Sequence, residues 1–266
     1  MKSFWQNSID AALLWYNMDA DYRAATVSYY VIFAIVPLLL LSVAIHSLVF
    51  GRDFIVQTLH DWGSILGADL LLLLSDAVRN LEAISDGFTI PITGILFFTG
   101  MVIMTFNTFT TGMHAIWGIS NRGFWGWVRK SRHSVTFMII FEVYLFCMLA
   151  VSYLLSVMPS MPWVVIFFLD ASFFLVMTTV LFSLAFRILP WQSPPRRSCL
   201  WGAFVASVLL YIARTLVALY VGWSPVPGLF GAAGLIVALL IWIFASSSII
   251  YYGAAFAFVH GRRKLR

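Results

Sequence analysis

Six long apolar segments occupy most of this chain, and they constrain its fold more than any other feature. They cover residues 26–50, 88–111, 135–157, 163–186, 200–222 and 229–259. A helix needs about 20 apolar residues to cross the hydrocarbon core of a bilayer. Each segment can therefore cross once, and the last is long enough to tilt or to project beyond the lipid. The sequence predicts an all-α, polytopic membrane protein with six transmembrane helices.

The low charge of the chain supports this prediction. Only 10% of the 266 residues are charged and 62% are hydrophobic, whereas soluble domains carry about 25% charged residues. This number of charged residues is too small to cover the surface of a soluble fold. Lipid must therefore cover most of the surface. We expect one membrane domain over residues 26–259, between an N-terminal segment 1–25 and a basic tail 260–266. Residues 1–25 lack the apolar core of a signal peptide, and we expect them to stay in the cytoplasm.

The basic residues predict the orientation. Of the 16 Lys and Arg residues, Arg52 and Arg79 fall in the loop after the first span and Arg214 falls inside a span. The other 13 fall in segments that share one side of the membrane in the six-span topology. Because Lys and Arg accumulate in cytoplasmic loops, both termini are expected in the cytoplasm.

The loop 51–87 is predicted to lie outside. It contains the run Leu70–Leu74, which Asp69 and Asp76 bracket too closely for a membrane crossing. We expect residues 61–85 to form an amphipathic helical segment on the outer surface. If this segment crossed the membrane instead, the orientation of everything downstream would invert.

Three charged residues fall inside predicted spans: Glu142, Asp170 and Arg214. A charge inside the bilayer is costly, so each is a candidate functional residue. Asp170 and Arg214 lie at similar depths in neighbouring antiparallel spans, so an ion pair is expected, with either a structural role or a role in a substrate or proton site. Glu142 lies deeper toward the cytoplasm and is expected to snorkel, to be protonated or to face a water-filled cavity.

Two spans carry polar side chains that either join helices or line a path. In the second span, Asn107, Thr108 and Thr111 lie on or beside one helix face. The last span carries Ser246, Ser247 and Tyr251. Such side chains form hydrogen bonds between helices in membranes.

Backbone features add two expectations. Pro37 is expected to kink the first span. Gly231, Gly234 and Gly253 permit close packing of the last span.

Catalytic signatures are missing from the sequence. The histidines are scattered, and no metal-binding spacing, P-loop or nucleophile elbow occurs. We therefore expect no enzyme activity, no cofactor and no nucleic-acid partner.

Several stretches together resemble the YihY/BrkB family. The resemblance begins at residues 24–38 and continues through the Asn107 to Trp117 region into the basic stretch ending at Arg132. Later matches are Leu189-Pro190, Trp201-Gly202-Ala203, Tyr220, Gly231 and Tyr252-Gly253-Ala254. These matches run from about residue 20 to residue 260.

The resemblance implies a bacterial inner-membrane protein with six helices. Members of the family often carry the label ribonuclease BN, which the residues above do not support. The leading hypothesis is a transporter or flippase-like permease for a lipid or other amphipathic envelope component. The alternatives are a non-enzymatic membrane scaffold or envelope assembly factor and, third, a membrane enzyme. Membrane lipids are the expected partners, and the sequence is compatible with an oligomer.

Overall fold

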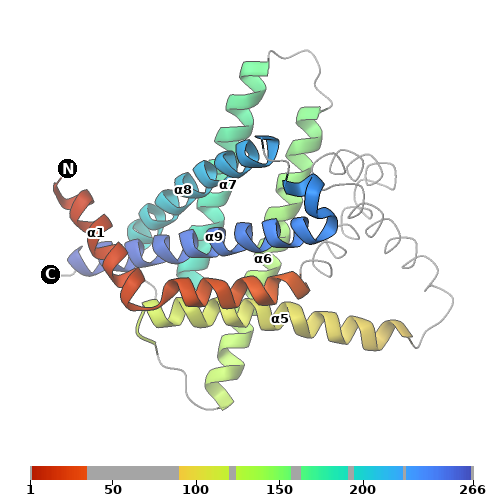
Figure 1. The fold of residues 1–266 in the computed structure, drawn as a ribbon. Helices are drawn as coiled ribbons and strands as arrows, with labels where there is room; N and C mark the ends of the chain where they lie inside the picture. The colour runs from red at the N-terminus through yellow and green to blue at the C-terminus, as the bar shows by residue number, and fades with distance from the viewer. Residues whose placement is uncertain are drawn as a thin grey trace.

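The computed structural model describes residues 2–34, 90–119, 124–156, 163–190, 195–223 and 226–264. Within these ranges the chain is helical (Figure 1). The helices are α1 Lys2–Asn17, α5 Ile90–Ile116, α6 Phe124–Ser156, α7 Trp163–Ile188, α8 Arg196–Trp223 and α9 Val226–Lys264. A further helical segment covers residues 20–34, and we call it the 20–34 helix.

Four of the predicted spans coincide with helices that are long and apolar enough to cross a membrane. These stretches are Trp125–Val151, Phe167–Ile188, Arg196–Val217 and Val237–Arg262 among the described residues. The predicted span 88–111 coincides with α5. Most of the predicted span 26–50, with Pro37, lies outside the described residues, as does the whole of the loop 51–87. The structure is thus that of a helical membrane protein with at least these four candidate spans.

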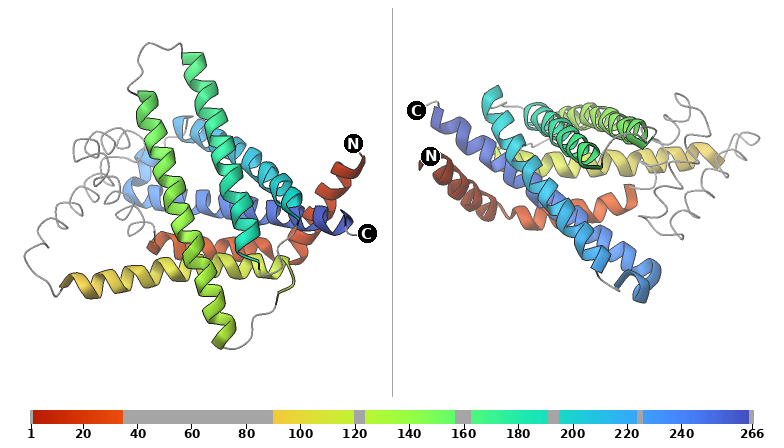
Figure 2. Two further views of the ribbon diagram at one scale, coloured as in Figure 1. Left: turned by 180° about the vertical axis from the view of Figure 1, so that it is seen from behind. Right: turned by 90° about the horizontal axis from the view of Figure 1, so that it is seen from above.

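Helix α9 is central to the arrangement. It contacts α1, α5, α7 and α8, while α6 and α7 run side by side across it (Figures 1 and 2). The contact with α8 is especially close, because a Cβ atom on Gly202 of α8 would overlap the backbone oxygen of Gly253 on α9. Gly253 therefore permits the close packing that the sequence predicted.

The residues before the first predicted span form a helix that the hydropathy pattern did not predict. Helix α1 ends at a turn in which Asp19 adopts a positive φ of 48°, a conformation that Asp tolerates better than most residues. The chain then continues as the 20–34 helix. This turn lets α1 fold against the C-terminal part of α9, where the Asn7 amide and the His260 ring nitrogen Nδ1 lie 3.1 Å apart.

Helix ends also differ from the ends of the apolar segments. Helix α6 begins at Phe124, well before residue 135, because the basic stretch around Arg129 is excluded from an apolar window but continues the helix. Helix α5 ends at a Schellman motif, in which Gly118 has a φ of +66° and Ile119 donates to the carbonyl of His114 over 2.8 Å.

Candidate functional site: an apolar cavity between the helices

A cavity of about 230 Å³ lies between the 20–34 helix, α5, α6, α7 and α9. Among the described residues, its lining is almost entirely aliphatic and aromatic, with three hydroxyl side chains. The residues that line it are Val27, Val31, Ala34, Val102, Thr105, Phe106, Phe109, Phe137, Phe141, Leu181, Phe182, Trp242, Ile243, Ser246, Ser247 and Ile250. A cavity of this chemistry suits an apolar ligand or part of one.

Four phenylalanines form one wall of the cavity. Phe106 of α5 makes edge contacts with Phe137 and Phe141 of α6, with ring centroids 5.8 and 5.9 Å apart. Phe109 stacks on Phe137 at 6.1 Å. Aromatic pairs at these separations attract each other beyond simple burial of area. The wall therefore joins α5 to α6 while leaving an apolar surface toward the cavity.

The predicted polar residues of the last span divide between the cavity and the packing around it. Ser246 and Ser247 line the cavity, and the Ser246 hydroxyl is buried with no hydrogen-bond partner among the described residues. Tyr251 is fully buried instead, and its hydroxyl donates to the backbone carbonyl of Phe109 over 3.3 Å. A buried hydroxyl without a partner is costly, so Ser246 is available to a polar atom of a ligand.

Thr105 is the hydroxyl on the opposite side of the cavity. Its side chain donates to the carbonyl of Tyr30 over 3.2 Å and to that of Met101 over 3.0 Å. The bond to Tyr30 ties α5 to the 20–34 helix at the cavity edge.

The predicted polar cluster of α5 contacts α6 outside the cavity. The Asn107 amide donates to Ser131 over 3.2 Å, and the Lys130 ammonium donates to Thr111 over 3.1 Å. Among the residues that the structure describes, Thr108 donates to the carbonyl of Met104 on its own helix, over 2.9 Å, and to no neighbouring helix. For Asn107 and Thr111, the expected bonds between helices are therefore present, and none of the three residues lines the cavity.

Two buried polar contacts near this cluster were missed from the sequence. Thr110 and Ser134 share a hydrogen bond of 2.9 Å between α5 and α6. His114 donates from Nε2 to the carbonyl of Leu189, 2.9 Å away. Burial lowers the pKa of His114, which lies beyond the predicted span 88–111. The hydrogen bond to Leu189 opposes this shift, and the nearby charges of Lys130 and His133 lower the pKa further. The neutral ring is favoured as a result.

The expected ion pair between α7 and α8 is present. A guanidinium nitrogen of Arg214 lies 3.6 Å from a carboxylate oxygen of Asp170, and the Arg214 guanidinium lies over the Phe174 ring, 5.0 Å from its centroid. The side chains of the pair are 47% and 43% exposed, and neither lines the cavity. Glu142 is buried in α6 and is likewise not part of the lining. The three charges and the cavity are thus separate features.

The aromatic wall is the main part of the site that the sequence reading missed. Phe106 and Phe109 are three residues apart on α5, and Phe137 and Phe141 are four apart on α6. These spacings place each pair on one helix face. The spacing was a usable signal, but phenylalanine is so frequent in this chain, with 24 residues, that the two pairs did not stand out.

The long apolar helices and the apolar cavity define a polytopic helical membrane protein. The chain belongs to the family described as Virulence factor BrkB, which matches residues 15–266. It is also 32% identical over 89 residues to a UPF0761 membrane protein from Chromobacterium violaceum. That match covers 33% of this chain and 21% of the relative, so the chain aligns with about a fifth of the relative's length. No solved structure matches the chain. The family predicted from the sequence is confirmed.

Proposed function

We propose that the chain is a transporter or flippase-like permease for a lipid or other amphipathic envelope component. The apolar cavity is the observation that supports this function best. Its lining would accept an acyl chain or another apolar group, and the Ser246 hydroxyl could bind a polar atom beside it.

The chemistry and the volume of the apolar cavity both restrict the class of substrate that it could bind. A hydrated ion needs charged or carbonyl ligands, whereas Glu142, Asp170 and Arg214 are all absent from the cavity lining. The volume of about 230 Å³ is below the roughly 300–1,000 Å³ of pockets that enclose drug-sized ligands. A chain-like substrate with only part of its length inside the cavity fits both observations.

The proposal places the protein in the bacterial inner membrane with six spans and both termini in the cytoplasm. Contacts between the two ends of the chain support an even number of spans. Asn7 lies 3.1 Å from His260, and the Tyr252 hydroxyl donates to the carbonyl of Ser8 over 3.2 Å. If residues 61–85 formed a seventh span, the two ends would lie on opposite sides of the membrane.

A scaffold or envelope assembly factor is the second candidate function. The glycine-mediated packing of α8 against α9 favours it, because a scaffold needs a rigid bundle more than it needs a cavity. No enzymatic step and no nucleic-acid partner form part of either proposal, since the sequence carries no catalytic constellation.

Filling the cavity separates the two functions. The full chain is reconstituted into vesicles of phosphatidylethanolamine and phosphatidylglycerol, and movement of a fluorescent phosphatidylethanolamine between leaflets is followed by chemical quenching. The Ser246→Phe variant adds a large ring inside the cavity, and the matched control Ile241→Phe adds the same ring at an exposed position of α9.

We expect the wild-type chain to accelerate lipid movement and Ser246→Phe to slow it, because the added ring occupies the space that the acyl chain would take. A loss of about 1.4 kcal/mol in binding of the chain would slow the movement about tenfold. Ile241→Phe should match the wild type. A wild-type rate equal to that of protein-free vesicles would favour the scaffold, as would equal rates for the two variants.

A further inference from the structure

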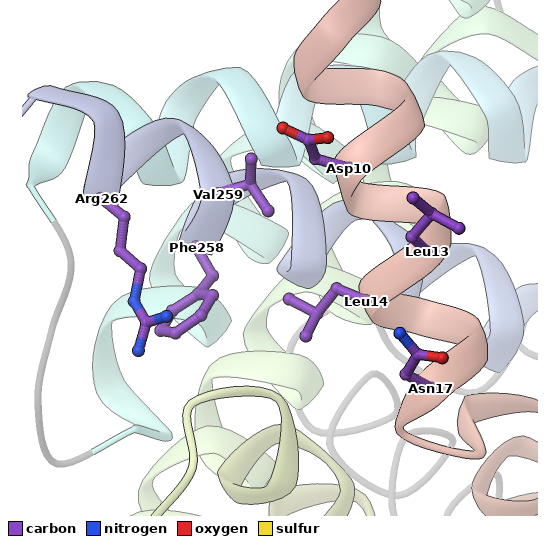
Figure 3. Close-up of a pocket in the computed structure, with 7 residues that line it drawn as sticks. All are labelled: Asp10, Leu13, Leu14, Asn17, Phe258, Val259 and Arg262. Carbon is purple, nitrogen blue, oxygen red and sulfur yellow. The ribbon is translucent and has the colours of Figure 1, made fainter.

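A second hollow lies at the other end of α9, between its C-terminal part and α1 (Figure 3). Its volume is about 590 Å³, and it shares no lining residue with the apolar cavity. We call it the α1/α9 groove. Its lining consists of Asp10, Leu13, Leu14 and Asn17 from α1 and Phe258, Val259 and Arg262 from α9.

The groove combines apolar surface with one cationic side chain, Arg262, and one carboxylate, Asp10. Leu14 and Val259 supply apolar surface from the two helices (Figure 3). The central carbon of the Arg262 guanidinium lies over the Phe258 ring, 4.3 Å from its centroid. This stacking holds the guanidinium plane in place while its N–H edge stays available for two parallel hydrogen bonds, the geometry that suits a phosphate.

The groove lies at the C-terminal end of the apolar part of α9. By its length and composition, the stretch from Val237 to Arg262 could cross a membrane, and a lipid headgroup is expected near Arg262 if it does so. The sequence continues with Arg263, Lys264 and Arg266. Basic clusters directly after a membrane span attract anionic lipids, so the basic sequence that follows Arg262 favours an anionic headgroup, with Asp10 as the one carboxylate in the groove lining.

Helix α1 carries an apolar stripe beside the groove. Trp5, Ile9, Leu13 and Tyr16 follow one helix face and are each more than half exposed. The opposite face packs on α9, where the Trp15 indole donates to the carbonyl of Ser248 over 3.1 Å. A helix with aromatic and aliphatic side chains on its outer face is typical of one that lies at the membrane interface. Leu13 belongs to both the stripe and the groove, so the two surfaces are continuous.

We propose that the α1/α9 groove binds the headgroup of an anionic phospholipid. Arg262 binds the phosphate, and the glycerol and upper acyl region lie against Leu13, Leu14 and Val259. Helix α1 is then held at the membrane interface by its own apolar stripe and by a bound lipid. This site is independent of the cavity and of the transport function proposed above.

Lipid retention by the purified full chain tests the proposal. The protein is mixed with phosphatidylglycerol or with phosphatidylcholine in detergent, and bound lipid is counted by native mass spectrometry. Arg262→Gln is compared with Arg132→Gln, which removes the same charge from an exposed position on α6. We expect the wild type to retain phosphatidylglycerol over phosphatidylcholine, and Arg262→Gln to retain about tenfold less, since a hydrogen-bonded charge pair is lost. Arg132→Gln should behave as the wild type.

A second pair of variants tests whether lipid loss is specific to the groove or follows from a general change of charge or of folding. Leu13→Glu places a carboxylate in the groove, whereas Ile9→Glu places one a single turn away on the same exposed face. Only Leu13→Glu should lose phosphatidylglycerol. Equal losses in the two Glu variants, an unchanged Arg262→Gln variant, or displacement of the lipid by inorganic phosphate at equal concentration would each overturn the proposal.

Discussion

Tyr251 of α9 donates a hydrogen bond from its hydroxyl to the backbone carbonyl of Phe109 on α5, and the two rings stack with centroids 5.4 Å apart. Phe109 lines the apolar cavity, so this contact fixes one wall of the cavity to the central helix. Gly112 makes the contact possible, because a Cβ atom at this position would overlap the Tyr251 hydroxyl.

Gly112→Ala should destabilise the protein by about 1–3 kcal/mol, because the buried tyrosine has no room to move. Gly100→Ala is the matched control on the same helix, since a Cβ atom there meets nothing within 4 Å. The control should be neutral, or more stable by up to about 1 kcal/mol, as alanine favours a helix over glycine. Chemical unfolding in detergent measures both variants. Equal effects would show that the Tyr251 contact does not depend on Gly112.

The Asp170–Arg214 pair should behave as a structural unit. Asp170→Asn and Arg214→Gln should each lower the yield of folded protein, because each leaves one charge in a span without its partner. The double variant should recover the yield, since it removes both charges together. Size-exclusion profiles of the three variants in detergent provide the measurement. If the double variant is worse than either single variant, or folds well but loses lipid movement, the pair has a role beyond structure.

His114 should make stability depend on pH. Its pKa is lowered from 6.5 in the folded protein, first of all by burial. Between that lowered value and 6.5 the unfolded chain binds more protons than the folded one, so the free energy of unfolding rises with pH through this window and levels off above it.

Unfolding temperatures measured one pH unit below and one above 6.5 test this expectation. The wild type should be less stable at the lower pH, and His114→Gln should show a smaller difference, since glutamine does not titrate but can still donate to the Leu189 carbonyl. The same pH difference in both proteins would assign the effect to other groups.

The features that follow from local sequence were predictable. Apolar length located α5, α6, α7, α8 and α9 but not α1. The short connection between 186 and 200 placed Asp170 beside Arg214. Gly253 indicated close packing because a glycine lets a neighbouring helix approach, whichever helix that neighbour is. Each of these inferences depends on one segment or on two neighbours in the chain.

Contacts between distant segments were not predictable in the same way. The contact of Asn7 with His260 joins residues 253 positions apart, and the bond of His114 to Leu189 joins residues 75 apart. In a chain so rich in apolar residues, most helix faces are apolar, so hydropathy does not indicate which face meets which neighbour. The cavity and the α1/α9 groove both arise from such pairings.

If the cavity between the helices holds an acyl chain, a photoreactive lipid should label the residues that line it. The reconstituted full chain is irradiated with a phosphatidylethanolamine that carries a diazirine at the end of one acyl chain, and adducts are located by peptide mass spectrometry. We expect adducts on cavity residues such as Phe106, Ile243 and Ile250, and we expect Ser246→Phe to lose them. Adducts confined to exposed positions such as Met104 and Ile241, with none on the cavity lining, would contradict it.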